Sequence, residues 1–281
     1  MANTITIIGV GLIGGSLALS LKEHGIADHV IGIDNNEKHL SKALELKLIE
    51  EKGSLEDAVK RSSLVVLAVP VDKMSELLPK VMQFVDQQVV IDMGSTKNHV
   101  TELLANHPKK GRFVATHPMW GTEYSGPEAA VSGAFINKAA VICNRAESDE
   151  DALELVEDMY RRIGMHLVYM EAHAHDIHAA YVSHIAHITS FALANTVLEK
   201  EKEDEAIFEL ASAGFESTVR LAKSNPSMWV PIFRENKENV LDVLNEHISQ
   251  LKKFKSCLEK DNYEYLNELI VKANGIKRII S

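Results

Sequence analysis

The chain has 281 residues, of which 46% are apolar and 25% charged. This balance is typical of globular proteins and excludes disordered and fibrous classes, and the length suggests two domains. Forty acidic against thirty basic residues give a formal net charge of −10. Since non-specific nucleic-acid binding needs a basic surface, we expect no nucleic-acid partner.

The compartment follows from the cysteines and from the start of the chain. Cys143 and Cys257 form neither a CxxC pair nor a metal-ligand spacing, so we expect a reducing compartment rather than a disulfide framework. No apolar run is long enough to span a bilayer, and the glycine-rich N-terminus lacks the basic region of a signal peptide. These features predict a cytoplasmic protein with no membrane partner.

Seven short runs rich in Val and Ile predict strands in the first part of the chain, and their nearly continuous hydrophobicity indicates burial on both faces. The runs are Thr4–Val10, His29–Asp34, Leu64–Pro70, Val89–Gly94, Arg112–Pro118, Ala139–Asn144 and His166–Met170. Segments of helical period lie between several of them. This alternation predicts an α/β fold with a doubly wound, mostly parallel Rossmann-type sheet.

The pattern changes near Met170, after which only helical segments are predicted. The expected helices are Ala172–Lys200, Asp204–Lys223, Ser227–Lys260 and Asn262–Ile279. We therefore predict two domains, a dinucleotide-binding domain over residues 1–170 and an all-α dimerisation and substrate domain over residues 171–281.

Gly9, Gly11 and Gly14 form a G-x-G-x-x-G motif between the first predicted strand and the first predicted helix. In this motif the first glycine permits a tight turn, the second lets a pyrophosphate approach the backbone, and the third lets helix and strand pack closely. The helix N-terminus then offers free amides to the phosphates.

An acidic residue stands at the distance that a dinucleotide site requires. Asp34 ends the second predicted strand and can accept hydrogen bonds from ribose hydroxyls while repelling a 2′-phosphate, so we expect NAD rather than NADP. The predicted cofactor-binding residues are Gly9, Gly11, Leu12, Ile13, Gly14, Asp34, Val69, Pro70 and Ser95.

Polar motifs follow three later strands: AVPVD (Ala68–Asp72), VIDMGSTK (Val90–Lys97) and THPMWGTEYSG (Thr116–Gly126). Ligands of open α/β sheets bind outside the carboxyl ends of the strands, so Ser95 and His117 are expected to meet over the nicotinamide. Two more motifs lie in the helical part, HDIHAAYVSHIAH (His175–His187) and GFESTVRLAKSNPSMW (Gly214–Trp229).

This ordered set of motifs resembles the prephenate dehydrogenase family, over nearly the whole chain. The resemblance implies a Rossmann domain joined to a helical dimerisation domain, and a homodimer. It also implies NAD(P)-dependent oxidative decarboxylation of prephenate, a dianion, to 4-hydroxyphenylpyruvate in tyrosine biosynthesis. A monofunctional member without a regulatory ACT domain is expected.

The resemblance also implies roles for individual residues. His117 matches the catalytic histidine that accepts the substrate hydroxyl proton, and Ser95 matches the serine that orients it. Arg220 matches an arginine that holds a substrate carboxylate. The other residues expected at the substrate are His187, His184, Thr122, Glu123 and Trp229.

Several alternatives remain open at this point. The enzyme alternatives are an arogenate dehydrogenase and another two-domain 3-hydroxyacid or imine reductase, and the non-enzyme alternative is an NAD-sensing Rossmann protein. Arg220 can instead be a structural ion-pair arginine, and Trp229 a core residue. His173, His175 and His178 lack the HExxH order, so no metal is expected. Trp120 stands where many members have alanine. Its ring can pack either against the substrate or against a neighbouring helix.

Overall fold

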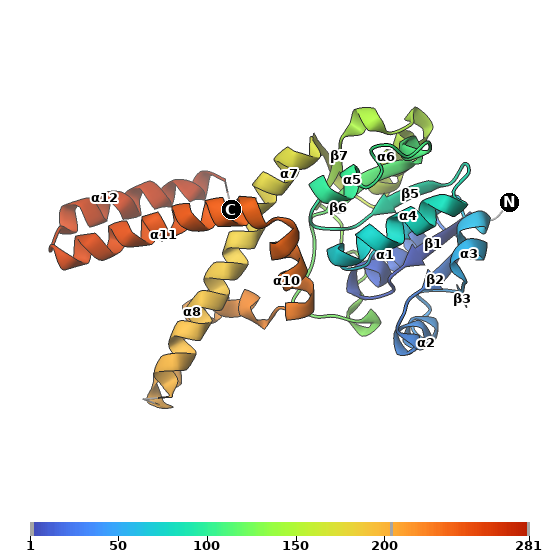
Figure 1. Ribbon diagram of the computed structural model, residues 1–281. Helices are drawn as coiled ribbons and strands as arrows, with labels where there is room; N and C mark the ends of the chain where they lie inside the picture. The colour runs from blue at the N-terminus through green and yellow to red at the C-terminus, as the bar shows by residue number, and fades with distance from the viewer. Residues whose placement is uncertain (1–2, 203–204, 280–281) are drawn as a thin grey trace. The chain divides into compact units, whose positions relative to one another are not determined.

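The computed structural model describes residues 3–202 and 205–279 (Figure 1). The chain forms two compact units, Met1–Asn236 and Lys237–Ser281. The predicted boundary near Met170 stays a prediction. Asp204, where the second predicted helical segment begins, lies outside the described residues, as do the outermost residues of both predicted domains.

An eight-stranded sheet forms the centre of the first unit, in the order β3-β2-β1-β4-β5-β6-β7-β8. All neighbouring strands pair in parallel except β6 and β7, which are antiparallel. The strands are β1 (Thr4–Ile8), β2 (His29–Ile33), β3 (Glu51–Lys52), β4 (Leu64–Leu67), β5 (Val89–Asp92), β6 (Phe113–Pro118), β7 (Ala139–Cys143) and β8 (His166–Met170). The doubly wound fold is confirmed, and only the two-residue β3 had no counterpart among the predicted strands.

The helices that alternate with these strands cover the sheet (Figure 1). They are α1 (Leu12–Glu23), α2 (Glu37–Glu45), α3 (Leu55–Arg61), α4 (Met74–Phe84), α5 (Asn98–Glu102) and α6 (Glu150–Arg162), with short 3₁₀ turns η1 (Val71–Lys73), η2 (Lys110–Arg112), η3 (Pro127–Ala129) and η4 (Arg145–Glu147).

Residues of one strand alternate between two hydrophobic clusters. Along β4, Leu64 and Val66 belong to one cluster and Val65 and Leu67 to the other, all at most 1% exposed. This is the period-2 alternation of a pleated strand with apolar layers on both faces. It explains why the predicted strands were nearly continuously hydrophobic.

The helical part of the first unit contains α7 (Ala172–Ala179), the π-helical turn η5 (Ala180–His184), α8 (Ile185–Glu201), η6 (Glu205–Leu210), α9 (Ala213–Val219), η7 (Arg220–Lys223) and α10 (Pro226–Glu235). Within the described residues, no strand follows β8, as expected. π-Turns inside α-helices occur frequently at functional sites, and η5 contains the SHIAH histidine His184.

Two helix predictions were wrong. The segment Asp204–Lys223 is not one helix, because its described part divides into η6, α9 and η7. Ser227–Lys260 is interrupted at Asn236, which leaves helical geometry (φ −107°, ψ 28°) and ends α10. The Asn236 amide nitrogen instead donates to the backbone oxygen of Asp176 at 2.7 Å. This tertiary contact outweighs a helical pattern that otherwise continues through the position.

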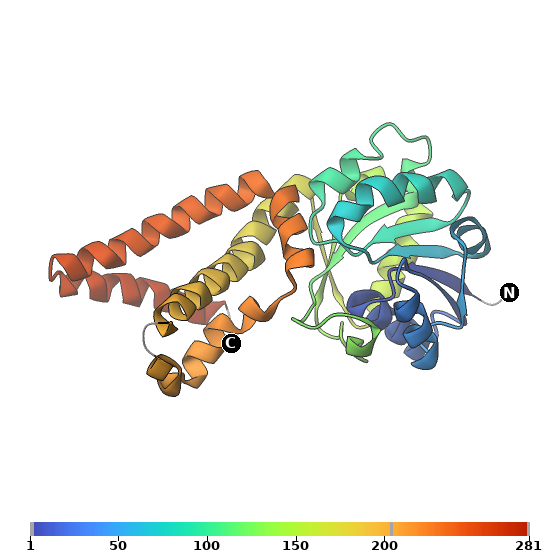
Figure 2. The same cartoon turned by 60° about the horizontal axis from the view of Figure 1, so that its bottom comes forward.

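The second unit is a pair of helices, α11 (Lys237–Glu259) and α12 (Tyr263–Ala273), followed by η8 (Asn274–Arg278). Figure 2 shows the two helices running in opposite directions. The turn between them uses Asp261 with a positive φ of 48°. Across the described residues of the chain, helices long and apolar enough to cross a membrane do not occur.

Candidate active site

The glycine turn between β1 and α1 has the geometry that its sequence predicts. Gly9 has a φ of +95°, and a Cβ there would lie 2.4 Å from the backbone oxygen of Ala68 on the neighbouring chain segment. A Cβ on Gly14 would lie 2.0 Å from the oxygen of Gly9. Around Gly11, by contrast, the space within 4 Å of a Cβ is open. The turn is therefore tightly packed except at the position that faces a phosphate in this motif.

Asp34 lies beside this turn with its carboxylate held in place. Its Oδ2 accepts from the backbone amide of Val10 at 3.1 Å and its Oδ1 from that of Asn36 at 2.8 Å. The ring of His39 lies 3.6 Å from Oδ2. The glycine turn and this oriented carboxylate fit the pyrophosphate and ribose of a dinucleotide. Of the other predicted cofactor residues, Val69 borders Gly9, Leu12 is buried, Ile13 is half-buried and Pro70 is exposed.

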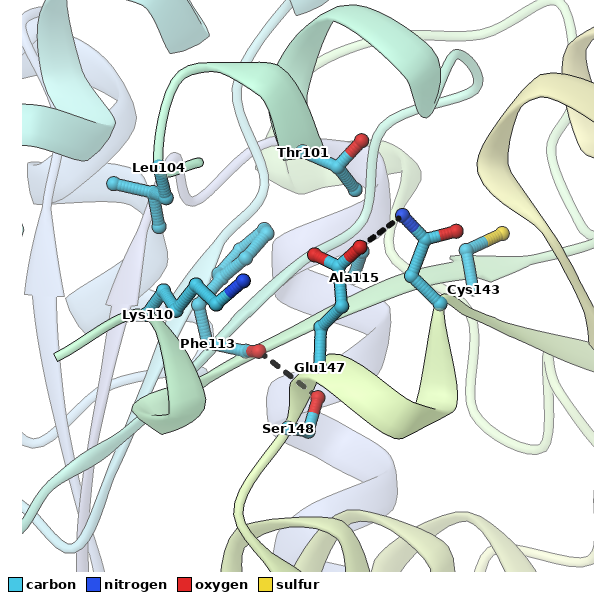
Figure 3. A pocket seen from close by; sticks show the side chains of 9 residues that line it. Thr101, Leu104, Lys110, Phe113, Ala115, Cys143, Glu147 and Ser148 are labelled. Carbon is cyan, nitrogen blue, oxygen red and sulfur yellow. Dashed lines mark hydrogen bonds between the residues drawn. The ribbon is translucent and has the colours of Figure 1, made fainter. Parts of the chain in front are cut away.

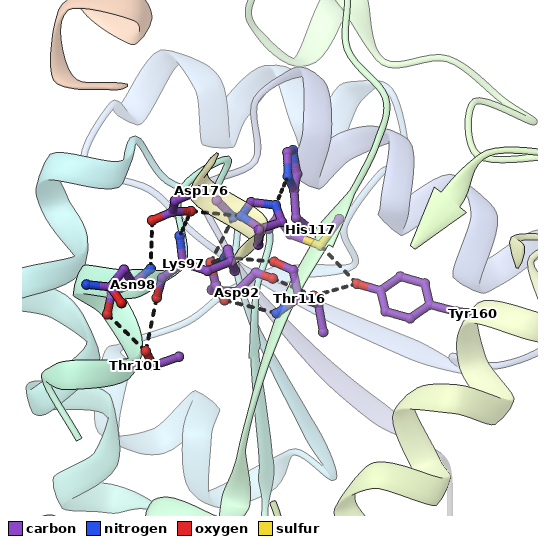
Figure 4. Close-up of polar contacts among 11 residues, drawn as sticks. Asp92, Lys97, Asn98, Thr101, Thr116, His117, Tyr160 and Asp176 are labelled. Carbon is purple, nitrogen blue, oxygen red and sulfur yellow. Dashed lines mark hydrogen bonds and ion pairs between the residues drawn. The ribbon is translucent and has the colours of Figure 1, made fainter. Parts of the chain in front are cut away.

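His117 lies in β6 near its carboxyl end and contacts the first helix of the helical part (Figure 4). Its Nδ1 lies 2.8 Å from Nε2 of His175 in α7. The second ring nitrogen of His175, Nδ1, lies 2.8 Å from Oδ1 of Asp176. Burial lowers the pKa of His117 well below 6.5, and the neighbouring His175 and Lys97 act in the same direction. The His117 ring is therefore neutral at pH 7 and able to accept a proton.

A buried ion pair lies next to the carboxyl end of β6. Lys97 and Asp92 are both fully buried, and the Lys97 ammonium contacts the Asp92 carboxylate and donates to the backbone oxygen of Thr116 at 2.8 Å. The Thr116 hydroxyl in turn lies 2.7 Å from the hydroxyl of Tyr160 (Figure 4). Because buried charges must be paired, these contacts fix the loop after β5 against the residue that precedes His117.

Three aromatic rings form a second cluster in the helical part. Trp229 in α10 stacks on His187 with ring centroids 3.4 Å apart and lies edge-on to His184 at 6.0 Å. Burial lowers the pKa of His184 to about 4 and also lowers that of His187. Trp229 is 6% exposed and packs with Val71, which follows β4. Trp229 thus lies in an apolar cluster that reaches the carboxyl edge of the sheet.

Arg220 begins η7 and forms an ion pair with Glu123 from the loop after β6, with 3.4 Å between Nη1 and Oε2. The guanidinium is half exposed, and its positive charge contributes to lowering the pKa of His187. Thr122, next to Glu123, is half-buried, and its hydroxyl accepts from the backbone amide of Tyr124 at 3.3 Å. The loop that follows His117 and β6 therefore also contacts the predicted carboxylate-binding arginine.

The structure connects the predicted substrate residues through a series of contacts. His184 and His187 both contact Trp229, and the charges of His184 and Arg220 contribute to lowering the pKa of His117 and of His187, respectively. Ser95 is half-buried. Within the described residues, the His117 ring is hydrogen-bonded to His175 and not to Ser95. The roles of these residues stay predictions.

The residues that hold His117 were not predicted from the sequence. His175 was a candidate only for a metal ligand, and Asp176, Lys97, Asp92 and Asn236 had no predicted role. The neighbouring His175 and Asp176 at the start of the helical part are the one sequence feature that could have indicated a histidine–carboxylate pair beside the site. Among the described residues, groups of three or more His, Cys, Asp or Glu side chains placed to hold a metal do not occur.

The position of Trp120 is now defined. Its ring lies edge-on to that of Phe135, with centroids 5.5 Å apart, and it packs against the hydrophobic cluster that contains Phe135. Phe135 is fully buried in the segment between β6 and β7. Trp120 therefore anchors the loop after His117 to the sheet-bearing part of the chain.

A separate small pocket lies between α5, β6 and η4, with Thr101, Phe113, Cys143 and Glu147 in its lining (Figure 3). It shares no lining residue with the predicted site. Burial raises the pKa of the Cys143 thiol to about 12, so this thiol is protonated and unreactive at neutral pH.

The glycine turn, the oriented acid after β2 and the half-buried imidazole at the carboxyl end of β6 define a dinucleotide-binding oxidoreductase. The family model of the prephenate dehydrogenase nucleotide-binding domain matches residues 17–169. The family model of the prephenate dehydrogenase dimerization domain matches residues 171–272. The chain belongs to the prephenate dehydrogenase family.

Individual relatives resemble the chain over most of its length. It is 31% identical over 270 residues to a prephenate dehydrogenase of Bacillus subtilis, covering 95% of this chain and 73% of that protein. It is 32% identical to a cyclohexadienyl dehydrogenase of Zymomonas mobilis, covering 94% and 91%. The crystal structure of prephenate dehydrogenase from Aquifex aeolicus with hydroxyphenyl propionate and NAD⁺ superimposes with a TM-score of 0.89 at 32% identity, covering 99% and 98%.

Proposed function

We propose that this chain catalyses the NAD-dependent oxidative decarboxylation of prephenate to 4-hydroxyphenylpyruvate, a step of tyrosine biosynthesis. The similarity to prephenate dehydrogenases along both parts of the chain supports this proposal. The observation that carries it is the neutral His117 imidazole, held by His175 at the carboxyl end of β6 and followed by a loop whose Glu123 contacts Arg220.

Gly11 and Asp34 are the main residues proposed to hold NAD. The open space at Gly11 admits the pyrophosphate, and the amides at the start of α1 donate to it. The Asp34 carboxylate, fixed by two backbone amides, accepts from the ribose hydroxyls and repels a 2′-phosphate. When bound, the nicotinamide accepts the hydride that leaves C4 of the substrate ring.

His117 takes up the proton of the 4-hydroxyl as the hydride leaves. The C–O bond gains double-bond character, the bond from C1 to its carboxylate breaks, and its electron pair completes the aromatic ring as CO₂ departs. The proton on His117 then returns to the phenolic oxygen. General-base catalysis of this kind contributes about 10²–10⁴-fold in rate, and a neutral ring with a lowered pKa suits it.

Arg220 is the proposed ligand of a substrate carboxylate. Its guanidinium is half exposed and its partner in this structure is a single carboxylate, Glu123. Exchange of Glu123 for a substrate carboxylate keeps the charge paired. His187 and Trp229 border this position, and among the described residues the buried Trp229 Nε1–H has no acceptor. His184, Thr122 and Glu123 complete the proposed substrate site.

The test is turnover of purified protein with prephenate and NAD⁺, followed by NADH absorbance. His117→Asn should reduce turnover by at least 10²-fold, on the scale of a lost general base, while NAD⁺ affinity stays that of the parent. The same assay with arogenate in place of prephenate tests the alternative, since an arogenate dehydrogenase would have the higher kcat/KM for arogenate. Absence of turnover with both substrates, despite NAD⁺ binding, would favour the NAD-sensing alternative.

Self-association through the helical domain, residues 171–281, is part of the same proposal. The helices α8, α11 and α12 carry exposed apolar side chains, including Leu198, Leu251, Leu258 and Val271 at 48–60% exposure. Exposed apolar surface of this kind marks interaction sites, and the matching family model is that of a dimerization domain. Sedimentation at micromolar concentration should give twice the mass of one chain, and a single-chain mass would contradict the proposal.

A further inference from the structure

Asp176 accepts three hydrogen bonds in the interior of the first unit. Its Oδ1 accepts from the backbone amide of Lys97 at 2.7 Å and its Oδ2 from that of Asn98 at 2.8 Å. The third donor is His175, at 2.8 Å from Oδ1. Asp176 is 3% exposed, and a carboxylate that accepts from backbone amides favours its charged form. An ionised carboxylate has no proton to donate, so the nitrogen of His175 that contacts it must carry one.

This requirement places one proton of His175 on Nδ1. In the neutral form of His175, Nε2 then carries no proton and can only accept. Nδ1 of His117 lies 2.8 Å from that atom and must therefore donate to it. Neutral His117 then has its lone pair on Nε2, the ring nitrogen that faces away from His175.

We propose that His175 and Asp176 are positioning residues that fix His117 in the tautomer with a free Nε2 lone pair, and that they stabilise its imidazolium when Nε2 takes the substrate proton. This role rests on the proposed function, in which His117 is the proton acceptor. Neither His175 nor Asp176 takes the proton. The Nδ1–H of His117 stays hydrogen-bonded to His175, and the negatively charged Asp176 accepts from the other ring nitrogen of His175.

The charged groups around His117 make such support necessary. A positive charge on His175 would lower the pKa of His117, and the ammonium of Lys97 and the ring of His184 act in the same direction. Lys97 is itself neutralised by Asp92 from β5. Asp176 is the carboxylate connected to His117 through a hydrogen-bonded ring, so it is the group placed to offset the imidazolium.

The first test reads the tautomer directly and needs no substrate. In protein with ¹⁵N-labelled histidine, long-range ¹H–¹⁵N correlation spectra distinguish protonated from unprotonated ring nitrogens, and the His117→Asn and His175→Gln variants assign the signals. We expect a protonated Nδ1 and an unprotonated Nε2 on His117 at pH 7.5. A proton on Nε2 of His117 would overturn the proposal. Because neither prephenate nor NAD is present, this outcome is independent of the proposed reaction.

The second test compares two replacements of His175. Gln places an amide oxygen near the position of Nε2 and can still accept from His117, whereas Leu cannot. Removing the hydrogen-bond partner that orients a metal-ligating histidine typically costs about 10–100-fold, and we expect His175→Leu to lower kcat by a factor of that order with KM unchanged. His175→Gln should recover most of the loss. The exposed His178 on the same helix provides the control, since His178→Gln should match the parent.

The pH profile separates positioning from a purely structural role. Removing a neutral acceptor destabilises the His117 imidazolium, so the acid limb of kcat/KM should move to lower pH in His175→Leu and stay in place in His175→Gln. A limb that moves to higher pH would mean that His175 carries a repelling charge, which contradicts the proposal. Equal losses in both variants with an unchanged limb would also overturn it.

Discussion

The rings of His187 and Trp229 are stacked, with centroids 3.4 Å apart and planes inclined by 26°. His187 comes from α8 and Trp229 from α10, so the contact joins two helices of the helical part. The same indole packs against Val71 at the carboxyl edge of the sheet. Trp229 is therefore a packing residue, and we propose that it also borders the substrate.

Replacement of Trp229 tests this dual role. Trp229→Ala should destabilise the protein by about 3–5 kcal/mol, the usual cost of removing a buried tryptophan. Trp229→Phe keeps an aromatic face for His187 and removes less buried volume, so it should cost less than Trp229→Ala. Urea unfolding monitored by circular dichroism checks both, since a fluorescence signal would be changed by the substitution itself. Equal costs for Phe and Ala would refute a stacking contribution.

Alanine substitutions at two glycines of the turn between β1 and α1 should have different effects on stability. A methyl group on Gly14 meets the backbone of Gly9, so Gly14→Ala should lower the melting temperature. A methyl group on Gly11 meets open space, and its φ of −75° suits any residue. Gly11→Ala should therefore leave the melting temperature of the free protein unchanged and weaken NAD⁺ binding, as shown by calorimetric titration. Unchanged NAD⁺ affinity in Gly11→Ala would contradict the proposed path of the pyrophosphate.

Arg220→Ala should raise the KM for prephenate by about tenfold to a hundredfold, because a charge-assisted hydrogen bond contributes about 1.5–3 kcal/mol. The kcat should change much less, since Arg220 is proposed to bind the substrate rather than to move its proton. Arg145→Ala removes another exposed arginine, one that packs on Tyr169, and is the matched control. A KM for Arg220→Ala within error of the parent would reject the assignment.

His184 should make the stability of the fold depend on pH. Burial lowers its pKa from 6.5 to about 4, so between these values the unfolded chain binds a proton that the folded chain excludes. The stabilisation from this group is complete above pH 6.5 and is lost as pH falls towards 4. The full loss is on the order of 3 kcal/mol.

The check is urea unfolding of parent and His184→Gln at pH 7.5 and pH 4.5. The decrease in unfolding free energy between the two conditions should be smaller in the variant than in the parent. His178→Gln, at an exposed position, should retain the parent's decrease. An identical decrease in all three proteins would show that His184 is not the responsible group.

The sheet, the glycine turn and the motifs after the strands could be predicted from the amino-acid sequence. These features have local causes: two-face burial makes β4 continuously apolar, and Gly9 and Gly14 are glycines because a Cβ would meet the backbone. Asp34 could be identified because its distance from the glycine turn is set by one strand and one helix. Patterns of this kind repeat within a few residues and can be recognised in one sequence.

The groups that support His117 and the ends of the C-terminal helices became apparent from the folded chain. His117 and His175 lie 58 positions apart in the sequence. Asp176 lies 79 positions from Lys97, whose backbone amide donates a hydrogen bond to it. Contacts between such distant residues leave no periodic signal. Asn236 interrupts a continuous helical pattern because its side chain reaches Asp176 and His184, which are far away in sequence. The physical reason is the same in each case: a buried polar group must find a partner, and the partner is chosen by the folded chain.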